Sequence, residues 1–90
     1  MMNSPEIKAF IRENSSLFWY TPEDKKEDIS QELLVETILN YGDMKQIRAL
    51  IKIMGMTEMS IIFFNASGRK KLNYFPEIYN YFTLLFTKHA

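Results

Sequence analysis

Few residues of this 90-residue chain could do chemistry, and their spacing does not support catalysis. Nucleophilic catalysis needs a base within reach of a serine, threonine or cysteine. The single histidine is His89, next to the last residue, and chain ends are usually mobile. Cysteine is absent, which excludes thiolate nucleophiles, cysteine-ligated zinc and disulfides. We therefore predict that the protein is not an enzyme.

Four carboxylates lie close together, at Glu23, Asp24, Glu27 and Asp28. A calcium loop places its oxygen ligands at alternate positions around a turn glycine, and this segment has neither that spacing nor the glycine. We interpret residues 21–28 as a charged connector that is exposed to solvent. Because cysteine is missing and the one histidine is terminal, we also predict no cofactor and no catalytic metal.

The net charge is zero, with 11 basic and 11 acidic side chains, but the charges are divided unequally along the chain. Residues 1–43 carry nine acids and four bases, whereas residues 44–90 carry two acids and seven bases. Either the two halves neutralise one another within one fold, or a basic face attracts an acidic partner or nucleic acid. The bases that could contact phosphates form two groups: Lys45, Arg48 and Lys52, and Arg69, Lys70 and Lys71.

Apolar residues recur every three to four positions in five segments, which is the spacing of amphipathic helices. These segments are residues 5–13, 30–41, 44–54, 58–65 and 77–87. The expected N-caps are Ser4, Ser30, Asp43 and Thr57, and the expected helix ends are Gly42, in a left-handed conformation, and Gly55. The sequence thus predicts an all-α fold, a compact bundle of about five short helices in an orthogonal or helix-turn-helix-like arrangement. We expect a single domain over residues 1–90.

An apolar quartet, residues 17–20, separates the first helix from the charged connector. We expect this quartet to plug the core and its member Trp19 to be buried. A Trp19→Ala variant should then lose about 3 to 5 kcal/mol of stability.

The last helix is apolar on more than one side. One stripe is formed by Ile78, Tyr81, Phe82 and Leu85, while Tyr79, Leu84 and Phe86 lie largely outside it. In a domain with a thin core, the second side either meets a partner or packs internally against residues 17–20. We predict a partner contact through this helix, formed by Ile78, Tyr79, Tyr81, Phe82, Leu85 and Phe86. If the partner is a second copy, the contact should be two-fold symmetric.

The third helix, the turn at residues 55–57 and the fourth helix together have the length of a helix-turn-helix. A reading helix must offer polar side chains to the base edges, and residues 58–64 offer almost none. Base-specific binding is therefore the weaker interpretation.

The chain begins without a basic segment followed by an apolar run, and it has no apolar stretch of about 18 residues. We expect a cytoplasmic protein with no membrane partner.

Four segments together resemble a family of small bacterial helical proteins that are often encoded beside nucleotidyltransferase toxins of the abortive-infection type. The segments are Leu17-Phe18-Trp19, Ile38-Leu39-Asn40-Tyr41-Gly42-Asp43, Leu50 to Gly55, and Tyr79-Asn80-Tyr81-Phe82. The likeness covers residues 17–86, and it departs from the family pattern at residues 68–73 and at Ile78-Tyr79. The resemblance implies an antitoxin-like or accessory role and carries no catalytic residues.

Our hypothesis is a non-enzymatic protein-interaction module, antitoxin-like or accessory to a nucleotidyltransferase toxin, whose partner is a toxin or a second copy. The alternative is a small DNA-binding transcriptional regulator with a degenerate helix-turn-helix.

Overall fold

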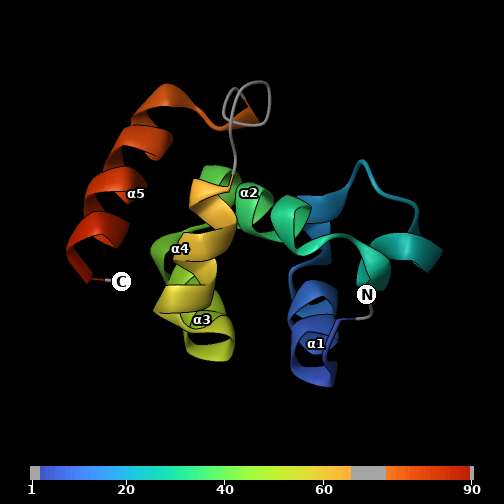
Figure 1. Ribbon diagram of the computed structural model, residues 1–90. Helices are drawn as coiled ribbons and strands as arrows, with labels where there is room; N and C mark the ends of the chain where they lie inside the picture. The colour runs from blue at the N-terminus through green and yellow to red at the C-terminus, as the bar shows by residue number, and fades with distance from the viewer. Residues whose placement is uncertain (1–2, 66–72, 90) are drawn as a thin grey trace.

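The computed structural model describes residues 3–65 and 73–89 of the chain (Figure 1). Five α-helices follow one another: α1 (Pro5–Glu13), α2 (Gln31–Tyr41), α3 (Met44–Met54), α4 (Met56–Phe64) and α5 (Pro76–His89). Two 3₁₀ helices, η1 (Ser15–Phe18) and η2 (Glu23–Asp28), lie between α1 and α2. The described ranges contain no strand, so the predicted all-α fold class is confirmed. A Cα radius of gyration of 12.4 Å is that of a compact chain of this length.

Side-chain caps fix where three of the helices begin. The Ser4 hydroxyl accepts a hydrogen bond from the Ile7 amide at 3.3 Å, and the Ser30 hydroxyl accepts one from the Leu33 amide at 3.1 Å. Asp43 starts α3 with a reciprocal capping box. The Asp43 carboxylate accepts a hydrogen bond from the Gln46 amide, and the Gln46 side chain accepts one from the Asp43 amide. These three predicted caps are confirmed.

Glycines end α2 and α3 for two different reasons. Gly55 has a φ of +91°, and because it also precedes the first residue of α4, a single residue separates α3 from α4. The predicted turn over residues 55–57 and the predicted Thr57 cap are therefore wrong. Gly42 is extended rather than left-handed, with φ −77° and ψ 159°. Glycine is needed there because a Cβ would lie 2.6 Å from the Ile38 carbonyl oxygen.

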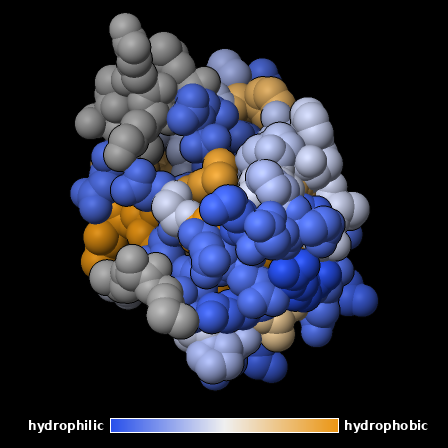
Figure 2. All heavy atoms as spheres, turned by 90° about the vertical axis from the view of Figure 1, so that its right-hand side faces the viewer, coloured by the Kyte–Doolittle hydropathy of each residue, from blue (hydrophilic) through white to orange (hydrophobic). Residues whose placement is uncertain are grey.

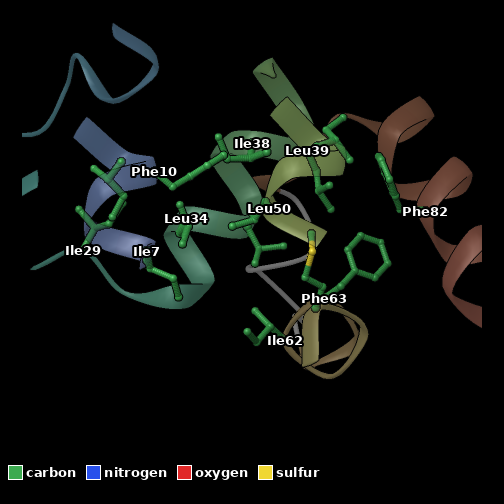
Figure 3. Packing of buried hydrophobic residues seen from close by; sticks show 14 of the residues in the cluster. Ile7, Phe10, Ile29, Leu34, Ile38, Leu39, Leu50, Ile62, Phe63 and Phe82 are labelled. Atoms are coloured by element: carbon green, nitrogen blue, oxygen red, sulfur yellow. The ribbon is translucent and has the colours of Figure 1, made fainter. Parts of the chain in front are cut away.

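Helix α2 is the centre of the bundle. Its buried side chains, which include Leu34, Val35, Ile38 and Leu39, point in more than one direction, and the helix contacts η1, α3 and α4. Figure 3 shows side chains of α1 on one side of α2 and side chains of α4 and α5 on the other. Helix α5 lies at the edge of the bundle and packs against α4 (Figure 1). The core therefore runs the length of the molecule with α2 through its middle.

Most of the charged connector is exposed, as predicted for residues 21–28, and this includes Glu23, Asp24 and Asp28, but one of its residues is buried. Residues 23–28 form η2, and Lys26 within it is buried, with only 5% of its surface exposed. The Lys26 Nζ donates to the Ser15 carbonyl at 3.1 Å and to a Glu23 carboxylate oxygen at 2.8 Å. A buried ammonium is tolerated because these acceptors replace its water. The hydrogen bond from Lys26, its charge and that of Arg12 lower the pKa of Glu23.

Helix α1 holds the same connector from the other side. The Arg12 guanidinium bridges two of the four carboxylates, Glu23 at 3.0 Å and Glu27 at 2.7 Å. The buried Asn3 amide donates to the backbone carbonyls of Glu27 at 2.9 Å and Ile29 at 3.0 Å. Figure 2 shows that the face over α1 and η2 is largely hydrophilic. These carboxylates therefore fix the connector onto α1.

Candidate functional site

The prediction that Trp19 lies in the core is wrong. Its side chain is 80% exposed, whereas its neighbour Phe18 is fully buried among the core residues. The backbone is helical through these residues, and consecutive side chains of a helical turn point about 100 to 120° apart. Only one of the pair can face the core, and Phe18 occupies that position.

Four exposed aromatic side chains, contributed by three segments of the chain, form what we call the aromatic ridge: Trp19, Tyr20, Tyr41 and Phe75. The rings meet edge to face in two pairs. The Trp19 and Tyr20 centroids are 5.5 Å apart, and those of Tyr41 and Phe75 are 5.4 Å apart. Aromatic rings favour this geometry because the positive edge of one meets the negative face of the other.

The C-terminal half of α2 connects the two pairs. The Tyr20 hydroxyl is hydrogen-bonded to the hydroxyl of Thr37, which lies one helical turn before Tyr41 and on the same side of α2. Asn40 holds the segment that carries Phe75, because its Oδ1 accepts from the Phe75 amide at 3.1 Å. Its Nδ2 also donates to the Asn73 carbonyl at 2.9 Å. Contacts with α2 thus fix the Tyr20 side chain and the backbone at Phe75, and these two residues carry the pairs to the same helix.

Sequence reasoning missed all four members of the ridge. Trp19 was predicted to lie in the core, and Tyr20, Tyr41 and Phe75 were not among the predicted site residues. Tyr41 and Phe75 each lie at a helix end, beside Gly42 and Pro76, where a large ring falls outside the packed stripe. This position was the one signal that could have found them.

Helix α5 uses its aromatic residues differently from the prediction. Phe82 and Phe86 are buried, and Ile78, Tyr79 and Leu85 are partly buried against the same core. The stripe that packs against α4 is centred on Phe82, so it includes the residues that were expected to extend outward. The interpretation of Tyr79 and Phe86 as surface residues is therefore wrong.

Two large apolar side chains of α5 are exposed, namely Tyr81 and Leu84, the latter at 73%. Tyr81 was predicted to be in the packed stripe and instead lies at its border. Among the six predicted contact residues, Tyr81 alone is exposed, at 51%. A partner contact through α5 stays a prediction, and it now depends on Tyr81 and Leu84.

The predicted basic residues of α3 share one face. Lys45, Arg48 and Lys52 are exposed, and none of them makes an ion pair within residues 3–65 and 73–89. Arg69, Lys70 and Lys71 lie outside the described residues. The exposed residues of α4 include Glu58, Ile61 and Phe64, and none of those on this helix is a base. The described structure thus offers cations for phosphate contact on α3 and no reading helix in α4.

A cleft of about 140 Å³ lies between the first half of α2, α4 and residues 73–74. Its lining residues are Ser30, Glu32, Leu33, Glu36, Ile62, Asn73 and Tyr74. The Asn73 amide donates to Glu36 Oε2 at 3.2 Å. Partial burial and the nearby charge of Glu32 raise the pKa of Glu36. Burial, followed by the charge of Glu36, raises the pKa of Tyr74. We call this site the acidic cleft.

Within the described part of the chain, no group of three or more histidine, cysteine or acidic side chains is placed to hold a metal ion. No helix in that part is long and apolar enough to cross a membrane. Comparison of the chain with protein-family models, with curated proteins and with solved structures finds no match in any of the three. The residues of the ridge, the cleft and the α3 face therefore supply the arguments about function.

Proposed function

We propose that this protein is a non-enzymatic protein-interaction module and that its partner binds the aromatic ridge. The observation that carries the proposal is the gathering of four exposed rings, from residues 19, 20, 41 and 75, on one side of α2. Exposed aromatic side chains that are gathered on one side of a helix are typical of interaction sites, and tryptophan and tyrosine are the residue types that most often dominate binding energy.

The way the rings are held also favours binding. Tyr20 is hydrogen-bonded to Thr37, and the backbone beside the Phe75 ring is fixed by Asn40. A side chain that is already fixed loses less conformational entropy when a partner covers it. The amphipathic rings of tyrosine and tryptophan remain compatible with water in the free protein and gain from burial in the complex.

The specific role that we propose is antitoxin-like or accessory to a nucleotidyltransferase toxin, in the cytoplasm. This part rests on the family resemblance described above. Two of the segments that carry the resemblance, Leu17-Phe18-Trp19 and Ile38-Leu39-Asn40-Tyr41-Gly42-Asp43, contain ridge residues. A partner shared by that family would therefore meet residues that lie on the ridge.

The test compares two double variants with the unmodified chain. Trp19→Ser with Tyr41→Ser alters the ridge, and Tyr81→Ser with Leu84→Ser alters the exposed side of α5 as a matched control. The protein encoded by the neighbouring gene is purified, and its affinity for each chain is measured by calorimetry. Light scattering detects a second copy as the partner, and circular dichroism verifies the fold.

We expect the ridge variant to lose at least about 100-fold in affinity, because hot-spot residues contribute about 2 kcal/mol or more each. The α5 variant should bind as the unmodified chain does. If the ridge variant binds normally and the α5 variant does not, α5 is the contact and the ridge proposal is wrong.

A second candidate function is phosphate binding by the α3 face. The observation that favours it is the exposure of Lys45, Arg48 and Lys52 along one side of α3, without an ion pair to any described residue. Binding to duplex DNA would then be independent of sequence. Its logarithmic affinity should fall with the logarithm of salt concentration by about 0.9 per phosphate contacted. A triple glutamine variant of these bases that binds DNA as well as the unmodified chain would exclude this candidate.

A further inference from the structure

The second ring pair of the aromatic ridge is held by one side-chain amide. Asn40 lies in the last turn of α2, and its Nδ2 donates to the Asn73 carbonyl at 2.9 Å while its Oδ1 accepts from the Phe75 amide at 3.1 Å. These two backbone groups flank Tyr74, whose side chain is buried in the core. The bond from Asn73 to Glu36 holds a side chain and not the backbone. Asn40 thus fixes the backbone on both sides of the residue that anchors this segment.

Few side chains could make both of these contacts. The position requires a donor for a carbonyl and an acceptor for an amide at the tip of one short side chain. Asparagine supplies both, whereas aspartate has acceptors only, and a serine hydroxyl is a single atom that would have to reach both groups. The orientation of the Asn40 amide is also determined, because a backbone carbonyl can only accept and a backbone N–H can only donate.

The next residue of α2 completes the arrangement. The ring of Tyr41 meets the ring of Phe75 edge to face at a centroid distance of 5.4 Å. The Phe75 carbonyl accepts from the Tyr79 amide, which ties Phe75 to the first turn of α5. Asn40 ties the same residue to α2. The place of the Phe75 ring beside Tyr41 therefore depends on Asn40.

We infer that Asn40 is the positioning residue of the aromatic ridge, which holds Tyr41 and Phe75 in the paired conformation that the partner binds. The role of the pair in binding rests on the proposed function, whereas the assembly of the pair can be measured in the free protein. A pair that is assembled before binding loses less conformational entropy when a partner covers it. If only a fraction of the molecules has the pair assembled, the apparent dissociation constant rises by the inverse of that fraction.

The first measurement is amide hydrogen exchange of the unmodified full chain, followed by NMR. The Phe75 amide is bonded to Asn40, whereas the Glu77 amide lies in the first turn of α5, where helix amides have no intrahelical acceptor. We expect the Phe75 amide to exchange more slowly than the Glu77 amide, after correction for their intrinsic rates. This comparison needs no variant, so it decides the inference even if a substitution prevents folding. Equal corrected rates would overturn the inference.

The second measurement uses Asn40→Leu, which keeps the branched shape of the side chain and removes its donor and its acceptor. Asn80→Leu, at an exposed asparagine of α5, is the matched control, and urea unfolding verifies that both variants fold. Asn40→Leu should speed the exchange of the Phe75 amide about 5-fold or more and weaken the NMR cross-peaks between the Tyr41 and Phe75 rings. The emission of Trp19 should stay unchanged in both variants, because that ring belongs to the other pair.

The third measurement is the rate at which each variant binds the purified protein that the neighbouring gene encodes. Asn40→Leu should weaken binding about 3-fold or more, and the loss should appear in the association rate, because fewer molecules present an assembled pair. Phe75→Ala removes a ring that the partner would contact, and it should mainly raise the dissociation rate. A residue that only stabilised the fold would change neither rate in a variant that is folded.

Results on the two proposals are distinguishable. If Asn40→Leu disturbs the Phe75 amide and the ring cross-peaks but binds the partner at the unmodified rate, Asn40 positions the pair and the function assigned to the ridge is wrong. If the ridge double variant loses its partner but Asn40→Leu leaves the amide and the cross-peaks unchanged, the proposed function stands and the inference about Asn40 is wrong.

Discussion

Two groups of aromatic rings in this protein have similar spacing between ring centroids and opposite exposure. In the inner group, Phe63 contacts Tyr74, Tyr79 and Phe86 at centroid distances of 4.9 to 5.2 Å, and Phe63 is fully buried. In the ridge, the paired rings are 5.4 and 5.5 Å apart and are exposed. Contact between two rings therefore does not by itself indicate whether they stabilise the fold or bind a partner. The inner group is covered by α4 and α5, whereas the ridge lies on the outside of α2, so the first stabilises the fold and the second is available to a partner.

The largest effect that separates the two groups is expected from truncation of their members. Phe63→Ala should destabilise the protein by about 3 to 5 kcal/mol, because it removes a buried ring and leaves a cavity among its neighbours. Phe75→Ala should cost about 1 kcal/mol or less, since that ring is exposed. Urea unfolding of both variants measures the difference, and equal losses would remove the distinction between the groups.

An intermediate effect is expected where the ridge is attached to the core. Thr37 is buried and its hydroxyl is bonded to that of Tyr20. Tyr20→Phe should cost about 1 to 3 kcal/mol, because it leaves the Thr37 hydroxyl with one fewer partner in a buried site. In a double-mutant cycle with Thr37→Val, the two losses should not add, since they remove the same bond. Additive losses would mean that the bond does not hold the ridge.

A small effect is expected for Trp19. Trp19→Ala should change stability by less than about 1 kcal/mol, because the ring is 80% exposed and its one aromatic partner is also on the surface. The neighbouring variant Phe18→Ala is the matched control and should cost about 3 to 5 kcal/mol. If Trp19→Ala is as destabilising as Phe18→Ala, the two residues share the core and the ridge loses its largest member.

The smallest effect concerns the pH dependence contributed by the cleft. The pKa of Glu36 is raised above its ordinary value of 4.5, first by burial and then by the charge of Glu32. Because this pKa is higher in the folded state than in the unfolded state, the folded protein binds the Glu36 proton more tightly. The stability that protonated Glu36 contributes is therefore fully present below the unfolded-state pKa, and it is lost as pH rises through the folded-state pKa. Carboxyl NMR titration should show that Glu32→Gln lowers the pKa of Glu36. No change in that variant would mean that the two acids do not interact.

The elements of the fold were predictable because their signals are local. The caps at Ser4 and Asp43 and the apolar spacing of α1 and α3 depend on residues within one or two turns. The burial of Lys26 was not predictable, since one of its two acceptors is a backbone carbonyl 11 residues earlier. A charge run read by itself indicates solvent exposure, and a fixed acceptor overrides that expectation.

The ridge was not predictable for the same physical reason. Its members are brought together by contacts between residues 33 and 35 positions apart, in which Asn40 holds the segment before α5. In α5, the apolar pattern covers so wide an arc that spacing alone does not fix its centre. Contact with α4 fixes the centre of the apolar face of α5. As a result, Phe86 lies in the core and Tyr81 lies at the border of the packed stripe. Packing between elements, which sequence spacing does not contain, decided both outcomes.

The most direct measurement of the central claim is the fluorescence of Trp19, which is the one tryptophan of the chain. In the free protein, its emission should be that of a hydrated indole, and acrylamide should quench it almost as efficiently as it quenches free tryptophan, because the side chain is 80% exposed. In the complex with a purified partner that lacks tryptophan, the emission should shift to shorter wavelength and quenching should fall several-fold. A complex that forms while the quenching of Trp19 stays unchanged would contradict the assignment of the aromatic ridge as the binding surface.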